Sequence, residues 1–171
     1  MQMVKRMFWG LLLVWGALLL FMPKEQLYFK LERELAKQGI ELNENVIEER
    51  IAGLTFKGVT LYVKGIEVAR ADQVDLLTLL FFSQLEVKGL HMDKGLESML
   101  PKSAERIVLM HSILSPTTIS IEGKGSFGTI EGKIDLATRT LHLDFVKSGE
   151  IGMLKSQLKQ GERGWYYETG F

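Results

Sequence analysis

Hydrophobic residues follow a helical spacing near the amino end of the chain and a strand spacing after residue 40. Residues 7–22 (MFWGLLLVWGALLLFM) contain no charged side chain. In residues 23–39 the apolar positions recur every three or four residues, which places them on one face of a helix. That face consists of Leu27, Tyr28, Leu31 and Leu35. The sequence therefore predicts an apolar helix followed by an amphipathic interaction helix.

From residue 40 onward, apolar and polar residues alternate, and a short unit of glycine, apolar, any and apolar residue recurs. The unit occupies residues 53–56, 58–61, 65–68 and 89–92. Alternation puts each apolar pair on one face of a sheet, and glycine turns between short strands are typical of an antiparallel meander. We predict a mainly β (α+β) fold with eight or nine strands, packed on two to four short helices.

Some segments depart from plain alternation. Residues 77–82 form an apolar run interrupted only by Thr78, which we interpret as a buried helical turn between two strands. Residues 93–103 predict a brief helix or loop, and residues 151–158 place apolar side chains on one helical face. Residues 165–167 (WYY) are typical of a last edge strand.

The apolar helix has the features of a membrane anchor. Its sixteen residues span roughly 24 Å, less than the roughly 30 Å hydrocarbon core, but flanking residues can close that gap. Lys5 and Arg6 precede it, and no A-x-A-like cleavage site follows, so we expect an uncleaved anchor. A buried core helix is the alternative, but it should show a polar stripe. The predicted anchor residues are Phe8, Trp9, Leu11, Leu12, Leu13, Val14, Trp15, Leu18, Leu19, Leu20 and Phe21.

The segments define an expected order of parts along the chain. They are a cytoplasmic tail (1–6), a transmembrane signal anchor (7–22), an amphipathic juxtamembrane helix (23–39) and a periplasmic β-rich domain (40–171). Basic residues on both sides of the anchor weaken the positive-inside argument, although the short basic tail resembles an export signal. We expect a single-pass protein of the bacterial inner membrane with its C-terminal domain in the periplasm.

Composition narrows the classes of function. The 171 residues include 21 Lys plus Arg and 21 Asp plus Glu, so the net charge is zero and no basic excess indicates a nucleic-acid partner. The chain has no Cys, which excludes disulfide scaffolds, thiolate zinc sites and cysteine nucleophiles. With 46% hydrophobic and 25% charged residues, global disorder is excluded as well.

The sequence contains no motif that strongly indicates a catalytic or cofactor-binding site. The letters of residues 123–128 match the dinucleotide fingerprint G-x-G-x-x-G, but a predicted strand follows where the phosphate-binding helix should begin. His91, His111 and His142 lie on separate strands without metal-ligand spacing. Asp72 and Asp75 are three apart on a strand and face opposite sides. We predict no catalytic residue, no cofactor and no metal.

The apolar face of the predicted sheet is the remaining candidate. Most of its residues should form the closed core of a small β domain, but a face left open on one side would make a groove. The candidate groove residues are Val59, Leu61, Leu79, Leu80, Phe81, Phe82, Val87 and Leu90. Alternation alone does not distinguish a closed core from an open groove.

Two stretches carry a family resemblance: residues 23–42 (PKEQLYFKLERELAKQGIEL) and residues 53–92, with the apolar run at 76–82. After an N-terminal anchor, they resemble type II secretion system protein N and the wider AsmA-like group of inner-membrane-anchored periplasmic proteins. The resemblance implies an amphipathic helix, glycine-spaced strands and a non-enzymatic role, and it supplies no catalytic residue. The chain is shorter than most members of these families.

These observations leave three functional hypotheses. The first is a structural subunit of a trans-envelope assembly, such as a secretion system, with other envelope proteins or copies of itself as partners. The second is an AsmA-like or lipopolysaccharide-export-like module that handles lipid in an apolar groove. A membrane-tethered enzyme is the third, and it depends on the three histidines and scattered carboxylates alone.

Overall fold

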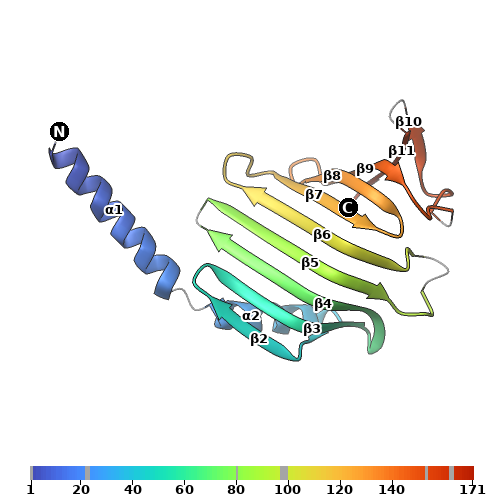
Figure 1. The fold of residues 1–171 in the computed structure, drawn as a ribbon, viewed down its shortest axis with the longest axis horizontal. Helices are drawn as coiled ribbons and strands as arrows, with labels where there is room; N and C mark the ends of the chain where they lie inside the picture. The colour runs from blue at the N-terminus through green and yellow to red at the C-terminus, as the bar shows by residue number, and fades with distance from the viewer. Residues whose placement is uncertain (1, 22–23, 80, 97–99, 153, 162–163) are drawn as a thin grey trace.

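The structure is a computed structural model that describes residues 2–21, 24–79, 81–96, 100–152, 154–161 and 164–171. It contains two helices and one antiparallel sheet of 11 strands (Figure 1). The helices are α1 (Gln2–Phe21) and α2 (Lys24–Lys37). The strands are β1 (Ile40–Asn43), β2 (Val46–Arg50), β3 (Gly53–Val63), β4 (Ile66–Leu79), β5 (Phe82–Met92), β6 (Ser103–Ser112), β7 (Thr118–Gly125), β8 (Gly128–Asp135), β9 (Thr140–Ser148), β10 (Lys159–Gly161) and β11 (Gly164–Gly170).

The strands form a meander. Their order is β1-β3-β4-β5-β6-β7-β8-β9-β11-β10, with β2 also paired to β3. From β3 to β9 each strand pairs with the next one along the chain, as expected when short turns join antiparallel strands. The prediction of a mainly β, antiparallel fold is confirmed, with more strands than the eight or nine expected.

The described residues of 77–82 do not form the helical turn that we predicted. β4 continues to Leu79, and β5 begins at Phe82, directly opposite it. Leu76 and Leu77 point to opposite faces and are both half-buried, so the apolar run marks a strand shielded on both faces. Sequence periodicity does not separate such a strand from a buried helix.

The other irregular segments agree with expectation in part. The described residues of 93–102 form a loop, one of the two alternatives predicted there, whereas the described residues of 151–158 form turns in place of a regular helix, with the Leu158 amide donating to the Leu154 carbonyl (3.1 Å). Residues 165–167 belong to β11, but the edge strand is β10, which pairs with the outer side of β11.

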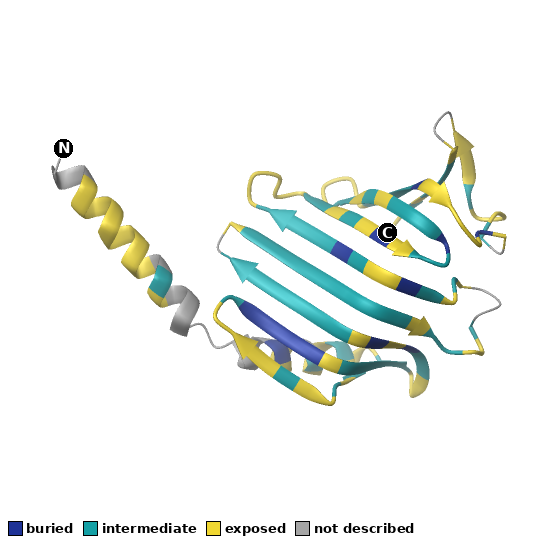
Figure 2. Ribbon diagram, in the orientation of Figure 1, coloured by how far each residue is buried: buried dark blue, intermediate teal, exposed yellow. Residues whose placement is uncertain are grey.

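Helix α1 projects away from the sheet and exposes apolar side chains (Figures 1 and 2). In the part of the chain that the structure describes, no helix is both long enough and apolar enough to cross a membrane. The predicted transmembrane helix is therefore not supported by the length and hydropathy of the described helices. The side chains of Trp15, Leu18, Leu19, Leu20 and Phe21 lie outside the described ones, as does residue 22.

Two glycines with a left-handed backbone conformation change which face of the sheet the neighbouring side chains point to. Gly58 in β3 and Gly89 in β5 both have φ of 62°, and the residue between them in the sheet is Asp72 of β4. A left-handed residue interrupts the two-residue alternation, so Phe56 and Val59 point to the same face although they are three apart. The apolar pairs on either side of each glycine therefore share one face.

Candidate functional site

One face of the sheet is apolar across most of its width. Residues that pair directly across antiparallel strands point to the same face, so the strand register defines rows. One row consists of Leu76, Leu85, Leu109, Ile121, Gly132 and Leu143. The neighbouring row consists of Val74, Val87, Ile107, Gly123, Ile130 and Phe145. We call this surface the apolar face.

Helix α2 covers the apolar face over β3. Tyr28 packs on Leu54, which is 2% exposed, and on Phe56, whose ring centroid lies 4.5 Å from that of Tyr28. The Tyr28 hydroxyl donates a hydrogen bond to Glu44 (2.8 Å). Burial, and then this contact with a carboxylate, raise the pKa of Tyr28, so the phenol stays neutral.

The segment 151–158 covers the other part of the apolar face. Ile151 is buried against Phe145, Phe127 and Ala104, and Leu154 and Leu158 pack on the same cluster. The apolar stripe that the sequence predicted in 151–158 therefore lies on the sheet, although the segment is not a regular helix. Burial of these aromatic and aliphatic side chains contributes on the order of 2 kcal/mol each.

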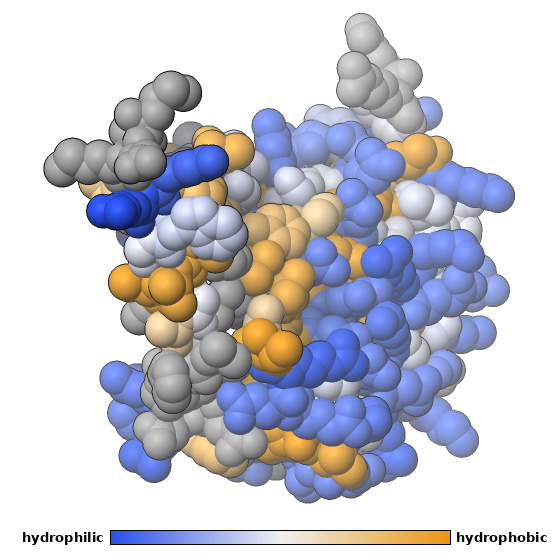
Figure 3. All heavy atoms as spheres, turned by 60° about the vertical axis from the view of Figure 1, so that its left-hand side comes forward, coloured by the Kyte–Doolittle hydropathy of each residue, from blue (hydrophilic) through white to orange (hydrophobic). Residues whose placement is uncertain are grey.

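Beside these two covers lies a set of apolar residues that, among the described residues, packs on neither buried cluster. Leu85, Val87, Leu109, Ile121 and Leu143 are half-buried and belong to neither cluster of the described core. We call these residues the central strip. Toward the β6–β7 and β8–β9 turns the apolar face continues through Ile119, Ile134 and Leu141. Figure 3 brings the α1 side of the molecule forward and shows hydrophobic side chains on that side, next to a mainly hydrophilic surface.

The opposite face of the sheet is charged, and its charges are sorted into rows. One row contains Asp75, Glu86, Glu122, Glu131 and Asp144. The next row contains Lys57, Lys88, Arg106, Lys124 and Lys147. Ion pairs link the two rows, including Lys88 to Asp75 (3.0 Å) and Arg106 to Glu86 (2.5 Å). We call this surface the charged face; such exposed pairs contribute roughly 0–1 kcal/mol each.

Asp75 is the best-satisfied carboxylate of the charged face. It accepts hydrogen bonds from Thr55 (2.7 Å), Gln73 (2.6 Å) and Lys88 (3.0 Å), and Thr55 is fully buried. Burial by itself would raise the pKa of Asp75, but the three donors outweigh it, so the pKa lies below its usual range. The arrangement holds β3, β4 and β5 together and leaves this carboxylate ionised and fully partnered.

The charged face also has two shallow hollows, both lined by Glu122 and Glu131. The larger, about 350 Å³, also contains His142, Lys133 and Asp144. His142 lies 3.2 Å from Asp144 and 3.3 Å from Glu168, and the contact with His142, ahead of that with Lys159, lowers the pKa of Glu168. The described residues contain no group of His, Asp and Glu that could hold a metal ion.

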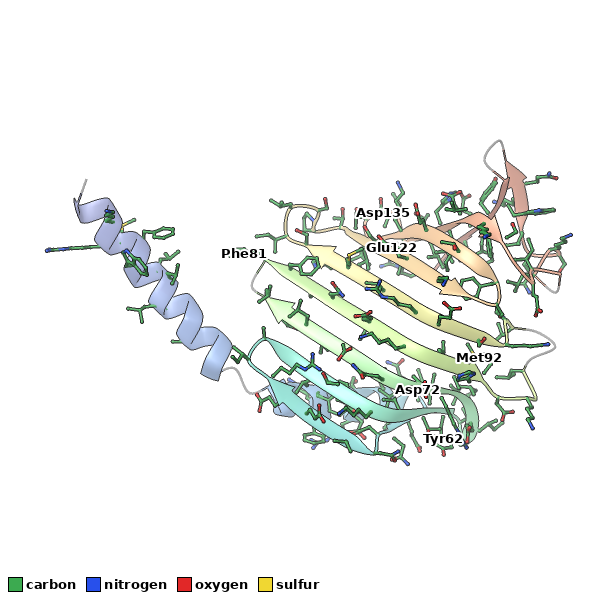
Figure 4. All side chains as sticks on the ribbon, viewed as in Figure 1. Tyr62, Asp72, Phe81, Met92, Glu122 and Asp135 are labelled. Carbon is green, nitrogen blue, oxygen red and sulfur yellow. The ribbon has the colours of Figure 1, made fainter. Side chains whose placement is uncertain are left out.

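The candidate catalytic residues are not brought together. His91 and His142 lie on the charged face at different strands, whereas His111 lies on the apolar face and contacts the Pro116 carbonyl (3.1 Å). Asp72 (labelled in Figure 4) lies in the bend between Gly58 and Gly89, and the hydrogen-bond partners of Asp75 are Thr55, Gln73 and Lys88. Residues 123–128 span the β7–β8 hairpin, in which Gly125 pairs with Gly128.

The structure divides the predicted groove residues among three places. Val59, Leu61, Val87 and Leu90 lie on the apolar face. Leu79 and Phe82 point to the opposite face, and Phe81 is exposed at the β4–β5 turn, so these three do not line the groove as predicted. Leu80 lies outside the described residues.

The predicted helix residues have mixed placements. In α2, Tyr28 is buried and Leu35 half-buried, while the side chains of Leu27 and Leu31 lie outside the described ones. In α1, the described members of the predicted anchor are exposed, namely Phe8, Trp9, Leu11, Leu12, Leu13 and Val14.

Sequence reasoning missed most of the central strip. Leu109, Ile121 and Leu143 come from the second half of the chain, where alternation was plain but the cross-strand register was unknown. The signal that could have found them is their position within each strand, counted from the turn that joins it to the next.

No protein-family model, curated protein or solved structure significantly matches this chain.

Proposed function

We propose that this chain is a non-enzymatic, membrane-attached protein that binds the acyl chains of lipids on the central strip of its apolar face. One observation supports this proposal most directly. α2 and residues 151–158 each cover a part of that face, and five half-buried apolar residues beside them belong to neither buried cluster: Leu85, Val87, Leu109, Ile121 and Leu143. An acyl chain is uncharged and flexible, and each methylene that it buries gains about 0.8 kcal/mol. The resemblance to AsmA-like proteins agrees with this proposal.

Attachment to the bacterial inner membrane, with residues 24–171 in the periplasm, is part of the proposal. It is supported by the uncharged run at 7–22 and by the exposed apolar side chains of α1, among them Phe8, Trp9 and Leu13. A helix that exposes large apolar side chains all along one segment needs an apolar environment.

The test compares two neighbouring positions of β6 that face opposite sides. Leu109 belongs to the central strip, whereas Met110 points to the charged face, and both are half-buried. Cells producing the full-length chain take up a photoactivatable fatty acid, and the crosslinked peptides are mapped by mass spectrometry. Because a carboxylate against an acyl chain costs well over 1.4 kcal/mol, Leu109→Glu should lose crosslinking about tenfold or more.

Met110→Glu is the matched control and should keep crosslinking to β5–β9 close to that of the unaltered chain. Urea unfolding of both variants checks that each one folds. Equal crosslinking in Leu109→Glu and Met110→Glu, or crosslinks confined to α1, would contradict lipid binding on the strip.

A structural subunit of a trans-envelope assembly is a second candidate, favoured by the open edges of the sheet. β10 has only three residues, and beyond it β11 presents Thr169 and Gly170 on its outer side. Such an edge can accept a strand from a partner chain. Chemical crosslinking of the native membranes distinguishes this role, because it predicts large protein complexes that include β11.

A further inference from the structure

One end of the sheet carries a row of exposed apolar side chains. It is formed by the turns β2–β3, β4–β5, β6–β7 and β8–β9 and by the end of β11. The exposed residues are Ile51, Phe81, Ile113, Leu114, Leu136 and Phe171. Leu114 is 91% exposed and Ile51 71% exposed. We call these residues the apolar rim.

Hydrogen bonds connect the turns of the rim to one another. The Ile113 amide donates to the Phe81 carbonyl (3.1 Å), and the Leu136 amide donates to the Thr117 carbonyl (2.8 Å). At one side the Thr78 amide donates to the Ala52 carbonyl (2.7 Å), and at the other the Phe171 amide donates to the Arg139 carbonyl (3.0 Å). These backbone groups are satisfied within the protein, so the rim can enter a less polar environment at little cost.

The opposite end of the sheet has a different chemistry. Its turns carry exposed Lys64, Lys94 and Lys102, and its exposed large apolar residues, Ile66 and Leu100, lie in separate turns. In Figure 4, Phe81 marks the apolar end, while Tyr62 and Met92 mark the other. The connections at this end include two long ones, residues 93–102 and 149–158, besides the short β3–β4 and β7–β8 hairpins.

The position of the helices indicates what covers the rim. α2 ends at the polar end of the sheet, where the Lys64 amide donates to the Gly39 carbonyl (2.6 Å), so its first residues lie toward the rim. α1 ends at Phe21 and α2 begins at Lys24, so the end of α1 is only a few residues from the end of α2 that points to the rim. A membrane that holds α1 would therefore lie next to the rim. Arg139, exposed in the β8–β9 turn, suits the anionic headgroups of such a surface.

We propose that the apolar rim lies in the interfacial layer of the membrane that holds α1, so that the central strip opens onto the bilayer. The strip leads to the rim on β7–β9 through Ile119, Ile134 and Leu141, whereas on β4–β6 the same row consists of Thr78, Ser83 and His111. Acyl chains then pass from bilayer to strip without crossing water. This inference rests on the proposed membrane attachment and adds the orientation of the sheet to it.

The test uses the full-length chain in vesicles of phosphatidylcholine and phosphatidylglycerol. Because the chain has no cysteine, Leu114→Cys and Ile66→Cys can each carry one environment-sensitive fluorophore. Both positions are highly exposed, Ile66 at 68%, but they lie at opposite ends of the sheet. We expect the label at 114 to shift to the blue and to be quenched by nitroxide lipids, and the label at 66 to do neither.

The outcomes separate this inference from the proposed function. If the chain floats with the vesicles but both fluorophores report an aqueous environment, the proposed placement of the rim is wrong and membrane attachment stands. A chain that does not float with vesicles would overturn both. The variant Phe81→Ser/Leu114→Ser should still float through α1 but lose crosslinking of acyl chains to the strip. Unchanged crosslinking in that variant would also overturn the inference.

Discussion

Single residues set the bend that brings the apolar pairs of β3 and β5 onto one face. Gly89 has a left-handed backbone, and a Cβ added there would meet the carboxylate of Asp72, whose Cγ would lie 2.6 Å away. Gly65 is also left-handed, with φ of 77°, but a Cβ there would meet nothing within 4 Å. The two glycines therefore separate backbone strain from the Asp72 contact.

We predict that Gly65→Ala lowers the free energy of unfolding by about 1–2 kcal/mol, the cost of a left-handed alanine, and that Gly89→Ala lowers it further. Urea unfolding of the full-length chain in detergent measures both. Adding Asp72→Ala to Gly89→Ala should restore stability to about that of Gly65→Ala. If the double variant is no more stable than Gly89→Ala alone, the close approach of Asp72 is not the cause.

Individual residues also show which features of the fold could be predicted from the sequence and which could not. The alternation in β7 and β9 correctly indicated which residues share a face within one strand, such as Ile119 with Ile121. It did not indicate that Ile121 lies in one row with Leu85, because that row depends on the register of two strand pairs, β5–β6 and β6–β7. The shift of facing at Gly58 and Gly89 requires backbone angles that periodicity does not reveal.

At the scale of elements, α2 acts as a cover that is fixed by one aromatic side chain. Tyr28→Ala should lower the free energy of unfolding by about 3–5 kcal/mol, because it uncovers Leu54 and Phe56. Tyr28→Phe removes only the hydrogen bond to Glu44 and should cost about 1 kcal/mol. Phe29→Ala, at the exposed neighbouring position, is the control and should cost less than either.

The two covering elements were predictable, but their common location was not. The apolar stripes of residues 23–39 and 151–158 both indicated segments that pack on something. The sequence placed no limit on which face each one covers, and it did not show that the residues of the central strip belong to neither buried cluster. That arrangement depends on which strands each segment packs on: α2 packs on Leu54 and Phe56, and residues 151–158 pack on Phe127 and Phe145.

For the whole molecule, the two covered regions suggest two units of stability within one sheet. Tyr28, Leu54 and Phe56 form one buried cluster, and Phe127, Phe145 and Ile151 form another. The strands between them share backbone hydrogen bonds and mostly half-buried side chains, and their described buried residues, such as Val108, belong to neither cluster. Residues that share buried contacts tend to unfold together, so local opening of one unit should leave the other unit folded.

Hydrogen exchange of the full-length chain in detergent tests this division. Tyr28→Ala should lower the protection of amides in β2–β4 and spare β8 and β9, whereas Phe145→Ala should do the reverse. Each substitution removes a buried aromatic side chain and should lower the free energy of unfolding by about 3–5 kcal/mol. A difference in overall destabilisation therefore does not explain different patterns of amide protection. If either variant lowers protection equally in both regions, the sheet unfolds as one unit. A two-unit sheet could change the width of the central strip while both covers stay in place, which is how one site would admit acyl chains of different sizes.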